Sequence, residues 1–427
     1  MLRSTPRSAR VGITAQFVTN GAVMSTLMPR LPEIKERFAL SDFAFGLIVT
    51  SVAVGAMCAA PLAGPIVRAI GALRCAVLGT LVVGAAVAAA AWSPSVWLFV
   101  VPMLIAGAVD SVVDAGQNVH GLAVQRWADK SIIGSLHAGW SAGAAAGGAI
   151  GVWAAASGVP LGLHVLINSV IVCAVAILGA LRARVPAEME KPHAQESAPA
   201  HSGSTETGSA EISSAKNASA TATSGRSRIP RPAVITLLLL SLLALSGTQI
   251  EDIANNWSTL YVGRDLAAPA AIAGLAFTLT LAAQFVSRVL SDPLTDRFGT
   301  DRVALAGGLS ITLGSLLVVC AVHPAMGIIG FMLAGLGSGP LVPAAFAGAD
   351  ATPGIPHGTG VAIVGWLMRL GFLATSPLIG AISSASSLRI ALLVPVLAGL
   401  VAVWITGRRV LAERRLIGLR LSAEAAE

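Results

Sequence analysis

The sequence predicts an all-α membrane protein with twelve transmembrane helices arranged in two bundles of six. Twelve long apolar stretches run through the 427 residues and charge falls mainly between them. Only 11% of the residues are charged and 55% are hydrophobic, whereas about a quarter of a water-soluble domain is charged. A bilayer core about 30 Å thick needs roughly 20 apolar residues for each crossing, which these stretches approach.

Six spans are expected before a marked change in composition and six after it. In chain order they are 11–28, 43–63, 73–91, 96–119, 133–155, 161–181, 233–261, 268–290, 303–322, 325–347, 360–382 and 390–405. The seventh is too long for a straight crossing and carries polar residues in its second part, so we expect it to be tilted, bent or partly outside the hydrocarbon. Gly247 precedes this polar part and is a place where the helix can break.

Basic residues mark alternate ends of the spans. Loops 92–95 and 157–160 are short and uncharged, whereas Arg and Lys gather in the loops on the other side and in both tails. Such residues stay on the cytoplasmic side of a membrane. We therefore expect both termini in the cytoplasm, which requires an even number of crossings.

Composition divides the chain into four parts. Residues 184–231 are rich in Ser, Ala, Thr, Pro and Gly and nearly lack bulky apolar side chains. Such a segment buries too little surface to offset its conformational entropy, so it is predicted to be a disordered cytoplasmic linker. The predicted parts are an N-terminal six-helix bundle (1–182), the linker (183–231), a C-terminal six-helix bundle (232–407) and a cytoplasmic tail (408–427).

A loop motif occurs once in each half, between the second and third spans. The back copy reads DPLTDRFGTDR (292–302) and the front copy reads GPIVRAIGALR (64–74). Both resemble the G-x-x-x-D-R-x-G-R-K/R loop of the major facilitator superfamily, although the back copy lacks the first Gly and the front copy lacks the acid. The resemblance implies a tight turn and a charge pair that latch neighbouring helices in one conformation. The implied latch residues are Asp296, Arg297, Gly299, Arg302, Gly64 and Gly71.

Three further segments resemble one branch of that superfamily. They read DAGQNVHGLAVQ (114–125), SLHAGWSAG (135–143) and EDIANNWSTLY (251–261). These patterns are similar to those of fucose-permease-like and rhizopine-transporter-like proteins of bacterial inner membranes. Gln125, Asp252 and Asn256 stand where the branch has Glu, Gly and Asp. The resemblance implies a monomeric, multi-pass transporter of a bacterial cytoplasmic membrane.

Ionisable residues inside the spans are the candidates for proton coupling, because a charge near the bilayer centre costs several kcal/mol on insertion. Asp110 and Asp114 lie one helical turn apart in the fourth span, on a stripe that also carries Gln117 and Asn118. The alternative is that these acids accept hydrogen bonds that fix helix packing, and for Asp110 the two interpretations weigh equally. The other proton-coupling candidates are His137, whose role in packing weighs equally, and Glu251 and Asp252.

Amides and an indole in the seventh span predict solute binding. Asn255 and Asn256 can bond the hydroxyls of a sugar or polyol while its C–H faces stack on Trp257. The alternative is a solvated outer helix end, with Trp257 and Tyr261 as interfacial anchors. The remaining substrate-binding candidates are Asn20, Gln117, Asn118 and Arg369.

Arg369 has two interpretations. It lies near the middle of the eleventh span, from which its side chain cannot easily reach water. An ion pair with Glu251 or Asp252 is favoured, and binding of an anionic group of the substrate is the alternative.

These features together predict a secondary active transporter that takes up a small polar solute with protons. Proton-driven efflux and a solute-binding membrane sensor are the alternatives. No nucleotide-binding loop, nucleophile–base pair or metal-ligand cluster stands out, so we expect neither an enzyme nor a cofactor nor a metal site. The net charge of +7 sits in loops and tails, so a membrane explains it better than nucleic acid does. The expected partners are the solute, protons and the lipid bilayer.

Overall fold

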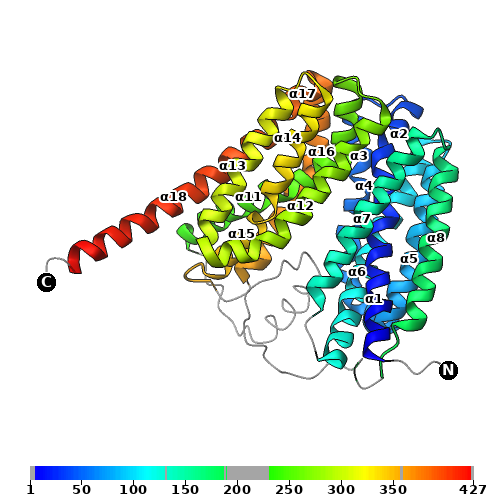
Figure 1. Cartoon of the computed structure of the whole chain (residues 1–427), viewed down its shortest axis with the longest axis horizontal. Helices are drawn as coiled ribbons and strands as arrows, with labels where there is room; N and C mark the ends of the chain where they lie inside the picture. The colour runs from blue at the N-terminus through cyan, green and yellow to red at the C-terminus, as the bar shows by residue number, and fades with distance from the viewer. Residues whose placement is uncertain (1–4, 130–131, 187–188, 190–229, 356–358, 425–427) are drawn as a thin grey trace.

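The computed structural model describes residues 5–129, 132–186, 189, 230–355 and 359–424, and these form helices and short connections. Two helical bundles lie side by side, α1 to α8 in one and α11 to α18 in the other (Figure 1). We call the end at which α8 finishes and α11 begins the linker end, and the opposite end, which carries α2 and α17, the far end. The bundles meet at the far end and diverge toward the linker end (Figure 1).

The N-terminal bundle is built from antiparallel helices joined by short loops, as close helix neighbours require. Its elements are α1 (Pro6–Ser25), the 3-10 turn η1 (Met28–Arg30), α2 (Leu31–Arg37), α3 (Asp42–Val49), α4 (Ser51–Ile70), α5 (Ala72–Ala91), α6 (Val96–Ala128), α7 (Ile133–Ala156) and α8 (Leu161–Arg182). Gly143 and Gly147 of α7 face the backbone of α1 at Val18 and Ala22. Because small residues let two helix backbones approach, α1 and α7 are packed tightly along their length.

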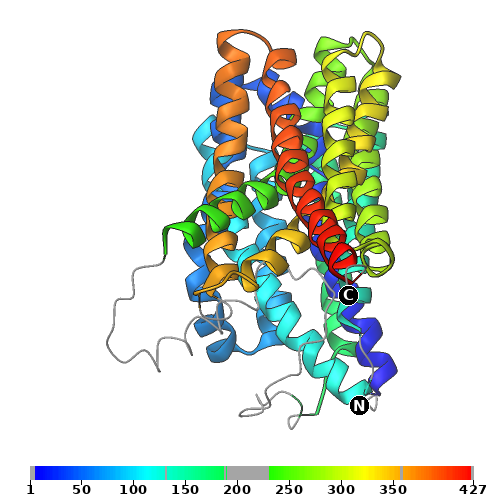
Figure 2. The same cartoon turned by 90° about the vertical axis from the view of Figure 1, so that its left-hand side faces the viewer.

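The C-terminal bundle repeats this construction. Its elements are α11 (Arg231–Ile253), the π-helical turns η2 (Ala254–Ser258) and η3 (Tyr261–Asp265), α12 (Ala270–Phe298), α13 (Thr300–Val319), α14 (Pro324–Ser338), α15 (Leu341–Asp350), α16 (Thr359–Ala385), α17 (Leu388–Ala391) and α18 (Leu393–Glu424). The long α18 crosses obliquely in front of its neighbours (red in Figure 2). It runs through the predicted boundary between bundle and tail at residues 407 and 408 without a break.

Ten helical stretches among the described residues are long and apolar enough to cross a membrane. Helices α1 and α7 also run through the bundle but are not among these ten. The reason is composition, since α1 carries Arg10, Gln16 and Asn20 and α7 consists largely of Gly and Ala. Neighbouring helices cover α1 and α7 on several sides, so these two need fewer apolar side chains than a helix surrounded by lipid.

The seventh predicted span is irregular, but not at the expected place. Helix α11 continues through Gly247, and the irregularity lies in the two π-helical turns that follow Ile253. Gly247 instead packs against α14 and α15, where an added Cβ would lie 3.0 Å from the Ser338 carbonyl oxygen. The expectation of a break at Gly247 was therefore wrong. π-turns often occur at functional sites because they widen a helix locally and redirect its side chains.

The repeated loop motif forms the same turn in both halves. Gly71 caps the C-terminus of α4 at φ 97°, and Gly299 caps that of α12 at φ 87°. Only glycine adopts this left-handed region without steric cost. The equivalent turns relate the two bundles as structural repeats. Most of the predicted linker, 187–188 and 190–229, lies outside the described residues.

Candidate binding cavity and its closure

A cavity of about 520 Å3 lies between the two bundles. Its wall on the N-terminal bundle comes from α1, α6 and α7, and the facing wall comes from α11, α12 and α14 to α16. Its polar and charged lining includes Asn20, Asp110, Asp114, His137, Trp140, Ser141, Thr248, Glu251, Arg288, Ser338 and Arg369. It extends toward the linker end as far as Ile133, the first residue of α7. A volume of this size suits a small solute.

A chain of hydrogen bonds crosses three helices in the N-terminal wall. The Trp140 indole N–H donates to Asn20 Oδ1 at 2.7 Å, and Asn20 Nδ2 donates to Asp110 Oδ1 at 2.7 Å. The close contact of α1 with α7 makes this possible, since Gly21 lies against the Trp140 carbonyl oxygen. Asn20, a substrate-binding candidate from the sequence, thus lies beside the candidate proton site Asp110.

The rest of the predicted stripe on α6 divides between two environments. Asp114 lines the cavity and accepts a hydrogen bond from Asn118 Nδ2 at 3.1 Å. Gln117 is buried and donates to the Gln16 backbone oxygen at 3.0 Å, so it bonds to α1 and is not part of the cavity lining. The reason is the close approach of α1 to α6 at this level. His137 lines the cavity and makes an edge contact with Phe17 at 5.2 Å between ring centroids.

The C-terminal wall contains an ion pair that the sequence analysis missed. Arg288 Nη2 lies 2.8 Å from Glu251 Oε2, and both side chains are part of the lining. The sequence signal for this pair was a basic residue, Arg288, inside an apolar predicted span, 268–290. Arg369 lines the same wall as predicted, but the partner that the geometry gives Glu251 is Arg288.

Asp252 points away from the cavity, toward α16. The Ser376 hydroxyl donates to its Oδ2 at 2.6 Å and Asn256 Nδ2 donates to its Oδ1 at 2.8 Å. Ser376 in turn accepts the Trp257 indole N–H at 3.0 Å. These residues form a polar cluster between the end of α11, η2 and α16, in which Asp252, Ser376 and Trp257 are buried and Asn256 is half-buried. Asn255, Asn256 and Trp257 are not among the residues that line the cavity, so their binding of solute stays a prediction.

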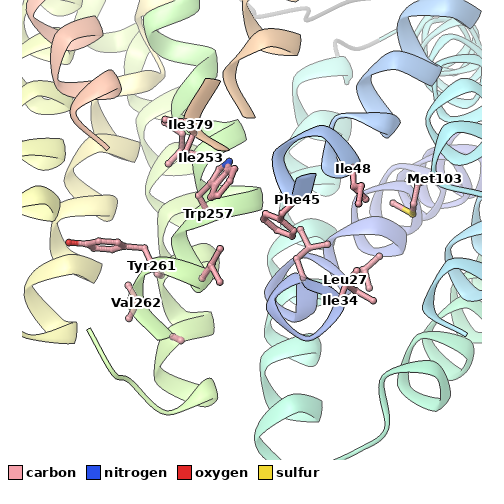
Figure 3. Close-up of a cluster of buried hydrophobic side chains, with 14 of the residues drawn as sticks. Leu27, Ile34, Phe45, Ile48, Met103, Ile253, Trp257, Tyr261, Val262 and Ile379 are labelled. Atoms are coloured by element: carbon pink, nitrogen blue, oxygen red, sulfur yellow. The ribbon is translucent and has the colours of Figure 1, made fainter. Parts of the chain in front are cut away.

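An apolar seal closes the far end of the cavity. Phe45 of α3 and Trp257 are both completely buried, and their rings meet edge to face at 5.2 Å (Figure 3). Around them lies a single buried cluster that contains side chains of both bundles, including Leu27, Ile34 and Ile253 (Figure 3). Tyr261 belongs to it, and its hydroxyl donates to the Val318 oxygen at 2.8 Å. The alternative of a solvated helix end at Trp257 and Tyr261 is therefore wrong.

Two glycines allow the backbones of the bundles to touch in this seal. A Cβ at Gly46 of α3 would collide with the Ser376 oxygen, and one at Gly380 of α16 would collide with the Asp42 oxygen. Such contact leaves no space for a solute to pass. The polar cluster around Asp252 therefore lies directly against the closed face of the other bundle.

An ionic cluster caps the seal. Asp42, only 9% exposed, is held at the N-terminus of α3 by the Ser41 cap. It accepts from Lys35 Nζ at 3.1 Å within its own bundle, and from Arg264 Nη1 at 2.9 Å and the Ser383 hydroxyl in the other bundle. Burial opposes the charge of Arg264, but its bonds to Asp42 and Asp265 outweigh this effect and raise the pKa of the guanidinium.

A family model describes nearly the whole chain. The model of the Major Facilitator Superfamily matches residues 13–263 and 237–423. The chain belongs to this superfamily. It is 27% identical over 394 residues to an uncharacterised transporter, y4wD, of Sinorhizobium fredii, covering 92% of this chain and 96% of that protein. It is 23% identical over 393 residues to the membrane protein MosC of Rhizobium meliloti, covering 91% and 87%.

Solved structures of the superfamily share the fold. The nucleoside transporter NupG aligns with a TM-score of 0.68 at 12% identity, over 94% of this chain and 98% of that one. A D-xylose–proton symporter aligns with a TM-score of 0.67 at 15% identity, over 94% and 96%. The transporter FucP, in its outward conformation, aligns at 0.54 and 18% identity, over 94% and 99%. The predicted twelve-helix fold and the predicted family are confirmed.

The superfamily loops lie at the linker end, where the bundles are apart. Asp296 and Arg297 are exposed, and the Arg297 guanidinium lies 5.2 Å from the ring centre of Phe298. The neighbouring charges of α13 pair with α18: Asp301 with Arg409 at 3.4 Å and Arg302 with Glu413 at 3.8 Å. The latch function of these loops stays a prediction, because these ion pairs lie within the C-terminal bundle.

Among the described residues, His, Cys, Asp and Glu side chains form no group of three or more that could hold a metal ion.

Proposed function

We propose that this protein is a proton-coupled secondary transporter that takes up a small polar solute, such as a sugar, a polyol or a related metabolite, by alternating access. The observation that carries the proposal is the cavity between the bundles, which has Asp110 and Asp114 on one wall and Glu251, Arg288 and Arg369 on the other. A solute bound there contacts both bundles, so its binding energy can favour one arrangement of the bundles over another.

The topology follows from the positive loops. With the linker end in the cytoplasm of a bacterial inner membrane, the far-end seal faces outward and the cavity opens inward. Superfamily relatives in Sinorhizobium fredii and Rhizobium meliloti support a bacterial membrane. Opening to the outside then requires the Phe45–Trp257 contact and the Asp42 cluster to separate, and the linker-end loops to engage.

Proton coupling is supported by the carboxyl groups of the cavity. Asp110, Asp114 and Glu251 can each change charge when exposed to either side in turn, and a proton entering down a potential of 100 mV releases about 2.3 kcal/mol. The solute class is supported by the amide, hydroxyl and indole groups of the lining. The folds of a nucleoside transporter and a D-xylose–proton symporter fit this class. We expect a monomer without enzymatic activity.

The experiment has two stages. Purified protein is screened by thermal unfolding against pentoses, hexoses, polyols, nucleosides, amino acids and cationic drugs, since a ligand at 100 times its Kd stabilises by about 2.7 kcal/mol. A stabilising solute is then offered to proteoliposomes with an imposed proton gradient of either direction. Accumulation with the inward gradient supports uptake. Extrusion driven by the gradient, or no gradient-dependent movement of any stabilising solute, contradicts the proposal.

A further inference from the structure

The hydrogen bonds of the N-terminal wall have a fixed direction. The indole N–H of Trp140 is a donor only, so the Asn20 atom that meets it at 2.7 Å must be the amide oxygen. The amide nitrogen of Asn20 is then turned toward Asp110, at 2.7 Å from Oδ1. Because an amide nitrogen can only donate, the Asp110 oxygen must accept.

This arrangement cannot easily reverse. Asn20 is 8% exposed, and α1 and α7 are held together by glycine contacts on either side of it. If the Asn20 amide turned over, its NH2 group would face the Trp140 N–H, and its oxygen would face the carboxyl group of Asp110. Two donors would then meet at Trp140, and the hydrogen bond to the indole would be lost. Trp140 thus fixes the orientation of the Asn20 amide, and the amide in turn offers Asp110 a permanent donor.

A permanent donor matters for an acid in a membrane cavity. Low polarity and a neighbouring acid both favour the neutral form of a carboxyl group, and such a group releases its proton reluctantly. A hydrogen bond donated to the carboxylate favours the charged form and makes release possible. The other titratable or charged groups around this cavity are Asp114 on the same helix, His137 on α7, and Glu251, Arg288 and Arg369 on the facing wall.

We propose that Trp140 is a positioning residue which, through Asn20, sets the pH at which Asp110 takes up and releases a proton. Neither residue carries the proton itself. The role of this arrangement in transport rests on the proposed proton-coupled function. The protonation of Asp110 itself can be measured without any solute. Failure of the transport proposal and failure of this one are therefore distinguishable.

The experiment is an infrared titration of the purified full-length protein in lipid nanodiscs, following the C=O stretch of protonated carboxylic acids. The component lost in Asp110→Asn reports on Asp110. Asn20→Leu removes the donor, and the midpoint of that component is expected to move to higher pH by about one unit. Trp140→Phe keeps an aromatic ring but removes the indole N–H, so the Asn20 amide is free to turn. The midpoint of the Asp110 component should then shift in the same direction by a smaller amount.

The double variant and a matched control make the test specific. If Trp140 acts through Asn20, Trp140→Phe adds no further shift in the Asn20→Leu background. The control is Trp153→Phe, a tryptophan of the same helix that is 65% exposed, and its midpoint should not change. Asn20→Ala serves if Asn20→Leu does not fold. Thermal unfolding of each variant identifies a merely structural effect, which would lower stability without moving the midpoint.

Three results would overturn the proposal. The first is a Trp140→Phe midpoint equal to that of the parent. The second is a full Trp140→Phe shift on top of Asn20→Leu. The third is an Asp110→Asn spectrum that loses no titrating component. If the predicted shifts occur but no solute of the panel is transported, the proton site stands and the transport proposal fails.

Discussion

Arg264 and Asp42 join the two bundles at the far end, where Nη1 lies 2.9 Å from Oδ1 and 3.1 Å from Oδ2 of the carboxylate. The pair is joined by the Ser383 hydroxyl, also from the C-terminal bundle, and by Lys35 from the N-terminal one. The Arg264–Asp42 pair lies next to the Phe45–Trp257 seal, and the bundles cannot separate at the far end while this pair persists. The pair therefore belongs to the group of contacts that stabilise the state with a closed far end.

Asp42→Asn should open the far end more often. Loss of a partly exposed ion pair costs about 1 kcal/mol, which corresponds to about a fivefold shift in the population of the open state. The shift is measured as the labelling rate of Thr248→Cys, a cavity position, by an impermeant thiol reagent added from the far side of a membrane. The background should lack the 4 native cysteines. Asp265→Asn is the matched control, because Asp265 pairs with Arg264 within the same bundle. Equal rates in Asp42→Asn and parent would contradict a role in closure.

Gly46→Ala should weaken the same closure by steric means. Its Cβ would collide with the Ser376 oxygen across the junction of the bundles, and overpacking of this kind costs about 1–3 kcal/mol. The cost applies only while the far end is closed, so far-side labelling of Thr248→Cys should rise as it does in Asp42→Asn. Gly407→Ala in α18 is the control, since the nearest atom to its Cβ would be Leu305 Cδ1 at 3.9 Å. A labelling rate in Gly46→Ala equal to that of the parent would show that the Gly46–Ser376 contact does not affect closure of the far end.

Much of the fold and part of the cavity could be predicted from the sequence. Hydropathy gives the depth of a residue in the membrane, and periodicity gives the side of its helix. They indicated that Asp110 and Asp114 share one face of the fourth span and that Arg369 lies near mid-depth, and all three line the cavity. Their roles in proton coupling and solute binding stay predictions. The turns at Gly71 and Gly299 were also predictable, because a repeated motif with a glycine at the same place indicates the same backbone conformation.

The remaining features depend on neighbours that a single sequence does not identify. The π-turns after Ile253 have no local sequence signal, yet they contain Trp257, which packs into the seal against Phe45 of the other bundle. The pairing of Glu251 with Arg288 depends on which helix packs beside α11. The contact of Asp42 with Arg264 joins positions 222 residues apart, and no local pattern indicates it.

Asp114→Asn should uncouple transport from the proton gradient. The amide keeps the size of the carboxyl group and its place on the cavity wall, but it cannot titrate. Uptake of a stabilising solute against its gradient should fall to the level of liposomes without protein, while exchange of labelled for unlabelled solute continues. Ser111→Ala is the control, because Ser111 lies on the same helix outside the cavity lining and its hydroxyl bonds to the Ala108 backbone oxygen. Undiminished uphill uptake in Asp114→Asn would assign the coupling proton to another acid, with Asp110 and Glu251 as the next candidates.

Two double-mutant cycles decide which arginine is the partner of Glu251. Arg288 lies 2.8 Å from Glu251 in a cavity that is open to water at one end, so we expect a coupling free energy of about 1 kcal/mol between them. Arg288→Ala should lower the thermal unfolding temperature because it leaves a carboxylate without its countercharge, and Glu251→Gln in addition should recover part of the loss.

The same cycle with Arg369→Ala should give a smaller coupling, since Arg369 lines the same wall but Glu251 is bonded to Arg288. A larger coupling with Arg369 than with Arg288 would restore the pairing expected from the sequence. Coupling with neither would leave both guanidinium groups as candidates for binding an anionic group of the solute, which a thermal-unfolding screen with sugar acids and acidic amino acids would then test.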